Sequence, residues 1–122
     1  MLVSIIDDDL SVRRALRRLI ASAGFSVETF ASGREFLDSD PLGRSHCIVL
    51  DIHLGGLNGF EVQEGLKAMG VQAPVIFITA HDDDATHERV AASGAAGYLR
   101  KPFEERALLD AIERALKKRD HP

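Results

Sequence analysis

Residues 47–51 read Cys-Ile-Val-Leu-Asp, an apolar run that ends abruptly on a carboxylate. Four apolar residues in succession, with loop-like sequence on either side, are typical of a strand buried on both faces, as in a parallel sheet covered by helices. A carboxylate is costly inside such a strand, so we expect Asp51 to lie where the strand emerges. In open α/β sheets this carboxyl edge is where ligands bind.

Three other strand-like runs end on polar side chains in the same way. They are residues 2–6 before Asp7 and Asp8, residues 75–78 before Thr79, and residues 97–100 before Lys101. If all four strands belong to one parallel sheet, then carboxylates, a hydroxyl and an ammonium gather at one edge of it. Residues 25–30 alternate between apolar and polar, which predicts a half-exposed strand at the side of the sheet.

The segment between the strand-like runs at residues 2–6 and 25–30 has the periodicity of a helix. An aspartate within residues 7–9 can cap a helix whose buried face carries apolar residues at 12, 16, 19 and 20. Gly24 predicts the end of that helix. The arginines at 13, 14, 17 and 18 mostly fall on the remaining face, which we expect to be a solvated surface.

Four more helices are predicted further along the chain. Ser32 and Glu35 have the spacing of a capping box that opens a short helix, and a loop follows at residues 40–43. Another helix runs from about Phe60 to Met69, with Val62, Leu66 and Met69 on its inner side. An alanine-rich, weakly amphipathic helix ends at Gly94, and the last helix turns inward Leu108, Ile112, Ala115 and Leu116.

Five strands that alternate with five helices predict an α/β fold in three layers, with right-handed crossovers and a doubly wound five-stranded parallel sheet. The flavodoxin-like strand order 2-1-3-4-5 is the usual solution, and it places residues 25–30 at the side of the sheet. Adjacent strands lie ~4.8 Å apart, so the polar strand ends would span about three such spacings. We expect one domain over residues 1–122, with residues 118–122 as a tail or the start of a linker to an output domain.

Composition limits the classes of function. Fifteen basic and nineteen acidic residues give a net charge of −4, which argues against a nucleic-acid or anionic-membrane surface on this domain. No apolar stretch approaches the ~20 residues of a membrane helix, and the N-terminus does not resemble a signal peptide. The single cysteine, Cys47, is expected to be a small buried hydrophobe, and a cytoplasmic location fits.

The expected edge residues indicate a particular chemistry. Crowded carboxylates raise one another's pKa unless a cation joins them, and a hard ion such as Mg²⁺ prefers their oxygen atoms. Lys101 is a poor ligand for a cation but suits an anion that arrives at the metal. Together with the hydroxyl of Thr79, such a site fits a phosphoryl group, and one carboxylate can act as the nucleophile.

Four motifs carry a resemblance to a known family. They are Ile5-Ile6-Asp7-Asp8, Asp51-x-x-Leu54-x-x-x-x-Gly59, Thr79-Ala80, and Tyr98-x-x-Lys101-Pro102-Phe103. Each is weak alone, but jointly and in this order they resemble the receiver domain of two-component response regulators over essentially the whole chain. The sequence is most similar to the FixJ type, partly through residues 101–105 and 109–115.

The resemblance implies a role for each site residue. Asp51 is the phosphoacceptor, fed by a sensor histidine kinase. Mg²⁺, or Mn²⁺ in its place, is bound by Asp8, Asp51 and the main-chain oxygen of His53, with Asp7 acting through water. Lys101 pairs with the phosphoryl oxygens and precedes a cis proline. Thr79 and Tyr98 are the switch residues, and the chain catalyses only its own phosphorylation and dephosphorylation.

The resemblance further implies that phosphorylation changes the face made by the helix ending near Gly94, the strand at 97–100 and the last helix. That face controls an output domain or partner, most often in transcription, and a weak or phosphorylation-dependent homodimer is expected there. The competing functions are a phosphorylation-independent interaction module and a phosphohydrolase with Asp51 as nucleophile. The hydrolase would need a second aspartate at position 53, where this chain has His53.

Each site residue also has a plain structural interpretation. Asp8 or Asp9 could serve only as a helix cap, Thr79 only as a hydrogen-bond donor at the sheet end, Lys101 as an exposed charge and Tyr98 as packing. The five histidines are scattered without a zinc-ligand pattern.

Two features depart from the family pattern or add to it. Gly55 stands where the family usually has proline, so we expect a more mobile loop after Asp51. His53 and His81 each stand two residues beyond a site residue, and we hypothesise that they border the phosphoryl pocket and tune dephosphorylation with pH.

Overall fold

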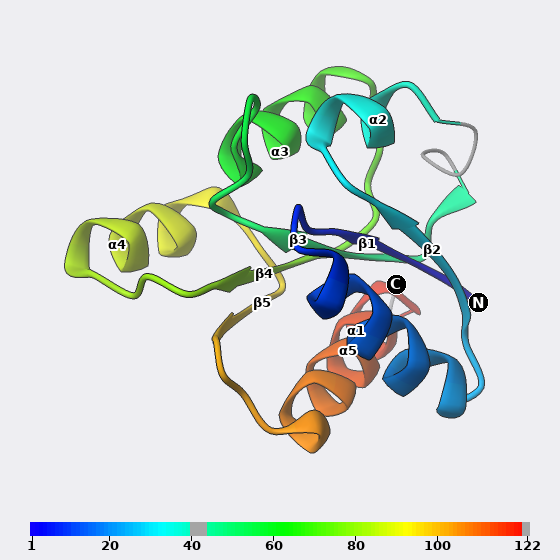
Figure 1. Cartoon of the computed structure of the whole chain (residues 1–122). Coiled ribbons are helices and arrows are strands. Elements are labelled where there is room, and N and C mark those ends of the chain that lie inside the picture. The colour runs from blue at the N-terminus through cyan, green and yellow to red at the C-terminus, as the bar shows by residue number, and fades with distance from the viewer. Residues whose placement is uncertain (40–43, 121–122) are drawn as a thin grey trace.

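The computed structural model describes residues 1–39 and 44–120. The elements alternate along the chain as β1 (Leu2–Ile6), α1 (Leu10–Ser22), β2 (Ser26–Phe30), α2 (Gly33–Leu37), β3 (Cys47–Asp51), α3 (Gly59–Ala68), β4 (Val75–Thr79), α4 (Asp84–Ser93), β5 (Gly97–Arg100) and α5 (Glu105–Asp120). The strands form one parallel sheet in the order β2-β1-β3-β4-β5 (Figure 1). The predicted fold class and strand order are confirmed.

The sheet separates two apolar cores. On one face, Val3 and Ile5 of β1 pack with residues of α1 and α5, and on the other face Ile6 packs with residues of α2 and α3. Figure 1 shows the same layers, with α1 and α5 below the sheet and α2 and α3 above it. Every residue of β3 and β4 is buried, as the unbroken apolar runs predicted.

The carboxyl end of β3 lies where the sequence placed it. Asp51 is the last residue of β3 and is opposite Ile78 of β4 in the parallel register. Cys47, at the other end of the strand, is a buried free thiol. The half-exposed strand at the side of the sheet is β2, which alternates between exposed and more buried positions as predicted.

Two local predictions differ from the structure. Met69 was expected on the inner side of α3, but the helix ends at Ala68, and Met69 is its C-cap and 54% exposed. At α2, Ser32 accepts the Glu35 N–H as predicted, but the Glu35 carboxylate accepts the N–H of Ala31 at 3.4 Å, so the box is incomplete. The complete capping box opens α3 instead.

The ends of the chain add two points. Helix α5 continues to Asp120, so residues 118–120 extend the helix where we expected a tail or linker. The loop predicted at residues 40–43 and the last two residues, 121–122, lie outside the described residues. Among the described helices, none combines the length and apolarity required to cross a bilayer.

The loop from β3 to α3 places a helix start against the carboxyl end of β3. Asn58 and Glu61 cap α3 reciprocally, with N–H to side-chain oxygen distances of 2.9 and 3.0 Å. The N–H of Gly59 donates to the carbonyl of Ile52 at 2.8 Å. A Cβ on Gly59 would lie 2.7 Å from the Asp51 carbonyl oxygen, so only glycine allows this approach.

Gly59→Ala is therefore expected to lower the free energy of unfolding by about 1–3 kcal/mol, because the atoms it would meet are backbone atoms that cannot move aside cheaply. The matched control is Gly55→Ala in the same loop, where a Cβ has nothing within 4 Å, and we expect it to change stability by less than about 0.5 kcal/mol. Urea denaturation of both variants is the measurement. Equal stability of the two variants would contradict the close approach.

Candidate functional site

Three strand ends bring their charged side chains together at one edge of the sheet. Asp7 follows β1, Asp51 ends β3 and Lys101 follows β5. The Lys101 ammonium donates to Asp7 Oδ2 at 2.7 Å and to Asp51 Oδ2 at 3.3 Å. The predicted convergence is thus present, although Lys101 lies 94 positions from Asp7 and 50 positions from Asp51 in the sequence. The peptide bond between Lys101 and Pro102 is cis, as the resemblance implied.

This group of charges is largely removed from water. Asp7 is fully buried, the residue Asp51 is 4% exposed and the Lys101 side chain is 20% exposed. Burial raises the pKa of Asp7, and the hydrogen bond from Lys101 only partly offsets it. For Lys101 burial alone would lower the pKa, but the hydrogen bond to Asp7 and the charges of both aspartates outweigh it, so its pKa is raised. Lys101 therefore stays an ammonium.

Backbone amides orient the two buried carboxylates. The N–H of Asp9 donates to Asp7 Oδ1 at 2.9 Å, and the N–H of His53 donates to Asp51 Oδ1 at 3.0 Å. Asp9 is the N-cap of α1, and hydrogen bonds from Ser11 lower its pKa. The cap among the three aspartates is thus Asp9, which leaves Asp7 and Asp8 for the site.

The acidic group has the donors of a hard cation site. Asp7, Asp8 and Asp51 each offer an oxygen, and these oxygens lie within 4.8 Å of one another. Asp8 is exposed, whereas the other two are buried, so the group opens to solvent on the side of Asp8. Carboxylate oxygens are the ligands preferred by Mg²⁺ and Mn²⁺. The part played by the main-chain oxygen of His53 and by a water on Asp7 stays a prediction.

Thr79 and two histidines lie at the neighbouring strand end. Thr79 is fully buried, and its hydroxyl accepts the N–H of His81 at 3.0 Å and donates to the His81 carbonyl at 3.1 Å. The rings of His53 and His81 meet edge to face, with their centroids 5.0 Å apart. The two loops that carry them therefore touch beside Asp51 and Thr79, and the dependence of dephosphorylation on pH stays a prediction.

Tyr98 makes a contact that sequence reasoning missed. Its hydroxyl donates to Asp82 Oδ1 at 2.8 Å, and the ring of His87 lies edge to face against it at 5.1 Å. Tyr98 also packs against the apolar core on the face of the sheet that carries α2 and α3. Asp82 belongs to the acidic run after Thr79, but nothing in the sequence distinguished it from its neighbours as the partner of Tyr98.

Comparison with known proteins agrees with this geometry. Residues 3–113 match the family model described as the response regulator receiver domain. Nodulation protein W of Bradyrhizobium diazoefficiens is 40% identical over 98% of this chain and 54% of its own length. Transcriptional regulatory protein FixJ of the same organism is 36% identical over 94% of this chain and 56% of its own length.

A solved structure extends the likeness to three dimensions. The response regulator StyR has a TM-score of 0.87 and 47% identity, covering 96% of this chain and 59% of its own chain. This chain thus spans about half the length of the curated relatives it matches. Sequence, fold and the strand-end site agree, and the chain belongs to the receiver domain family of two-component response regulators.

Proposed function

We propose that this receiver is a phosphoacceptor switch in which Asp51 accepts a phosphoryl group from a sensor histidine kinase in a Mg²⁺-dependent reaction. The observation that carries the proposal is the contact of one ammonium, Lys101, with two buried carboxylates at 2.7 and 3.3 Å beside an exposed third, Asp8. Receiver domains are signalling proteins and not metabolic enzymes, so the chemistry concerns the domain itself.

The transfer is a nucleophilic displacement at phosphorus. A carboxylate oxygen of Asp51 attacks the phosphorus, the bond from phosphorus to the histidine nitrogen breaks, and the nitrogen takes the bonding electron pair. The product is an acyl phosphate on Asp51. The hydrogen bond from the His53 N–H to Asp51 Oδ1 supports this role, because it holds the carboxylate in one orientation.

The remaining residues bind and neutralise charge. Mg²⁺, held by Asp8, Asp51 and the main-chain oxygen of His53 with Asp7 acting through water, would supply charge neutralisation for the transferring phosphoryl group. Lys101, already an ammonium in the resting site, would exchange its contact with Asp51 for the phosphoryl oxygens. The hydroxyl of Thr79 would turn from His81 toward the new anion.

The signal would leave the site through Thr79 and Tyr98. A phosphoryl group adds about two negative charges, which shifts an existing equilibrium of the domain rather than creating a new fold. Tyr98 would leave Asp82 and turn inward as Thr79 moves, changing the face made by α4, β5 and α5. We propose a weak or phosphorylation-dependent homodimer through that face.

The role of the whole protein follows from its relatives. FixJ is described as a transcriptional regulatory protein, and this chain spans about half its length. We propose that residues 1–122 form a single receiver that controls a transcriptional output domain or partner in the cytoplasm and does not itself contact nucleic acid or membrane.

The proposal is tested with acetyl phosphate and Mg²⁺. We expect one phosphoryl group per chain, labile to hydroxylamine as an acyl phosphate is, and none in Asp51→Asn. Lys101→Met should slow the modification at least about tenfold, because the transferring charge loses its ammonium, while the exposed α5 variant Lys118→Met should react like the wild type. Steady release of phosphate over many turnovers would instead indicate a hydrolase, and no modification would favour a phosphorylation-independent module.

Mg²⁺ should also stabilise the folded chain. At about ten times its Kd, the ion is expected to add about 1.4 kcal/mol to the free energy of unfolding, because it binds only the folded site. Asp8→Asn should remove most of this gain, since it deletes one carboxylate of the group. Glu64→Gln, an exposed change of equal charge on α3, should retain it. Urea titrations with Mg²⁺ or EDTA measure the gain, and an undiminished gain in Asp8→Asn would exclude this metal site.

The contact between Tyr98 and Asp82 in the unphosphorylated chain can be followed by ultraviolet absorbance, because the chain has one tyrosine and no tryptophan. Burial and then the hydrogen bond to Asp82 raise the pKa of Tyr98 to about 12, so its phenol should remain protonated as pH rises past 10. Asp82→Asn should lower this pKa, because it removes the negative charge beside the hydroxyl. Ultraviolet titration of the phenolate, with circular dichroism to follow the fold, is the measurement. A midpoint near 10 in folded protein would contradict the contact.

A further inference from the structure

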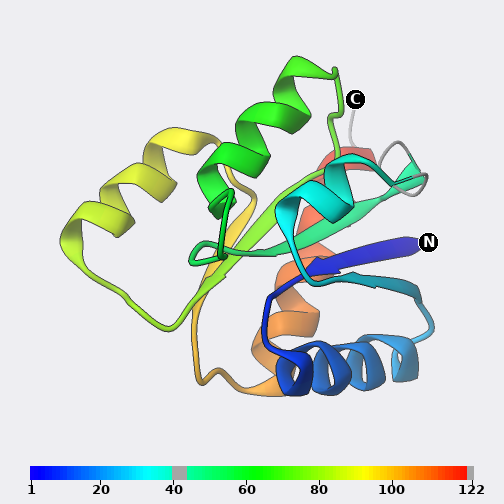
Figure 2. The same cartoon turned by 45° about the horizontal axis from the view of Figure 1, so that its top comes forward.

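Helix α4 is the helix of the described chain that packs least. Val90 is its only buried residue, whereas α3 buries several residues along its length, from Gly59 to Leu66. Figure 2 shows α4 beside α3 on the same side of the sheet. A helix with one apolar anchor depends on polar contacts at its ends for a fixed position.

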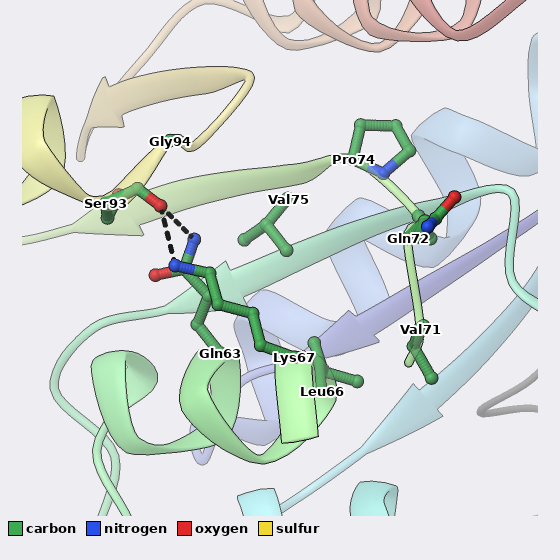
Figure 3. A pocket seen from close by; sticks show the side chains of 10 residues that line it. Gln63, Leu66, Lys67, Val71, Gln72, Pro74, Val75, Ser93 and Gly94 are labelled. Carbon is green, nitrogen blue, oxygen red and sulfur yellow. Dashed lines mark hydrogen bonds between the residues drawn. The ribbon is translucent and has the colours of Figure 1, made fainter. Parts of the chain in front are cut away.

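Two side chains of α3 hold the carboxyl end of α4. Gln63 Nε2 and Lys67 Nζ both donate to the main-chain carbonyl of Ser93, at 3.2 and 3.1 Å (Figure 3). This carbonyl belongs to the last residue of the helix, and Gly94 ends the helix in the left-handed conformation. Carbonyls at a helix end lack intrahelical partners and carry the negative end of the helix dipole, so an amide and an ammonium are well matched to it.

These hydrogen bonds lie at the wall of a groove. The groove between the end of α3 and the start of β4 has a volume of about 410 Å³ and is lined by Gln63, Lys67 and Ser93 together with the loop before β4. Figure 3 shows the Gln63 and Lys67 side chains, which line this groove, extending to Ser93. Gln63 is 5% exposed, so its amide has few other partners to exchange for the carbonyl.

The amino end of α4 is held by contacts of another kind. Asp82, just before the helix, accepts the hydrogen bond of Tyr98, and His87 contacts the Tyr98 ring. Further along α4, next to Val90, the guanidinium of Arg89 lies over the ring of Phe60 of α3, 4.3 Å from its centroid. A cation–π contact allows the cation a range of positions over the ring. Two hydrogen bonds to one carbonyl restrict the position of that carbonyl more closely. If Tyr98 turns inward as proposed above, its contacts with Asp82 and His87 change.

We propose that Gln63 and Lys67 clamp the carboxyl end of α4 and make it the fixed point about which this helix responds to phosphorylation of Asp51. The response to phosphorylation rests on the proposed function, whereas the clamp is a property of the resting fold. On this basis the amino half of α4 is released when Tyr98 leaves Asp82, and the carboxyl end stays where α3 holds it.

Hydrogen exchange of the unphosphorylated chain tests the clamp. In Gln63→Met/Lys67→Met, we expect amides of residues 90–96 to exchange about tenfold faster than in the wild type, because the helix end loses a neutral and a charged hydrogen bond. The matched control, Gln72→Met/Lys117→Met, makes the same chemical changes at exposed positions, Gln72 in the same groove and Lys117 on α5. It should exchange like the wild type.

Two further variants separate the clamp from a general loss of folding. Lys67→Met alone changes an exposed residue, and it should speed exchange at residues 90–96 while leaving the sheet strands protected. Lys67→Arg, which retains a charged donor, should restore exchange close to that of the wild type. Exchange in the double clamp variant equal to that of the matched control would overturn the clamp.

Exchange after acetyl phosphate and Mg²⁺, on protein whose mass shows the added phosphoryl group, tests the fixed point. In the wild type we expect faster exchange over residues 82–88 and unchanged exchange over residues 90–96, and in the clamp variant faster exchange over both. Equal changes at both ends of wild-type α4 would overturn the fixed point. Failure of the chain to take up phosphate would overturn the proposed function and the response of α4, while the clamp is decided by the resting exchange.

Discussion

The structure of this receiver depends on one ammonium group held between two buried carboxylates. Lys101 follows β5, a strand that pairs with β4 and has no contact in the sheet with β1 or β3. Its four-carbon side chain must therefore extend across the end of β4 to reach Asp51 and Asp7. A buried carboxylate such as Asp7 is tolerated only with a partner of this kind, and removing one member of a buried pair generally costs about 3–5 kcal/mol.

The same ammonium explains why the site suits a divalent ion. With all groups ionised, three carboxylates and one ammonium leave two negative charges in the group formed by Asp7, Asp8, Asp51 and Lys101. A monovalent ion would leave one of these two negative charges uncompensated, whereas a divalent ion balances both. On the proposed function, an incoming phosphoryl group would meet two cations, the ammonium of Lys101 and a divalent ion bound by the carboxylates.

The sequence predicted the meeting of Asp7, Asp51 and Lys101 because the required signals are local. Each apolar run ends where its polar residue begins, and parallel strands bring such ends to one edge, so Asp51 and Lys101 could be placed together without coordinates. The same reasoning failed at Met69, since a helical pattern does not show where the last turn ends. It also missed Asp82 and Ser93 as contact points, because their partners Tyr98, Gln63 and Lys67 lie on other elements and no periodicity encodes the pairing.

Helix α4 shows most clearly that contacts between elements cannot be predicted from the sequence of one element. Its alanine-rich sequence predicted a weakly amphipathic helix, and the structure agrees, with Val90 alone buried. A weak apolar face leaves the position of a helix to hydrogen bonds with neighbours, and such bonds depend on the exact placement of two elements. The position of α4 therefore could not be read from its own sequence.

The division of the interior into two cores has a consequence for how such a domain diversifies. The residues beneath α1 and α5 form one cluster and those beneath α2 and α3 form another, with only the sheet between them. Substitutions in one layer need compensation within that layer and along the strands, but not across the molecule. The two faces can therefore change in sequence independently, while the strand ends that carry Asp7, Asp51 and Lys101 stay in place.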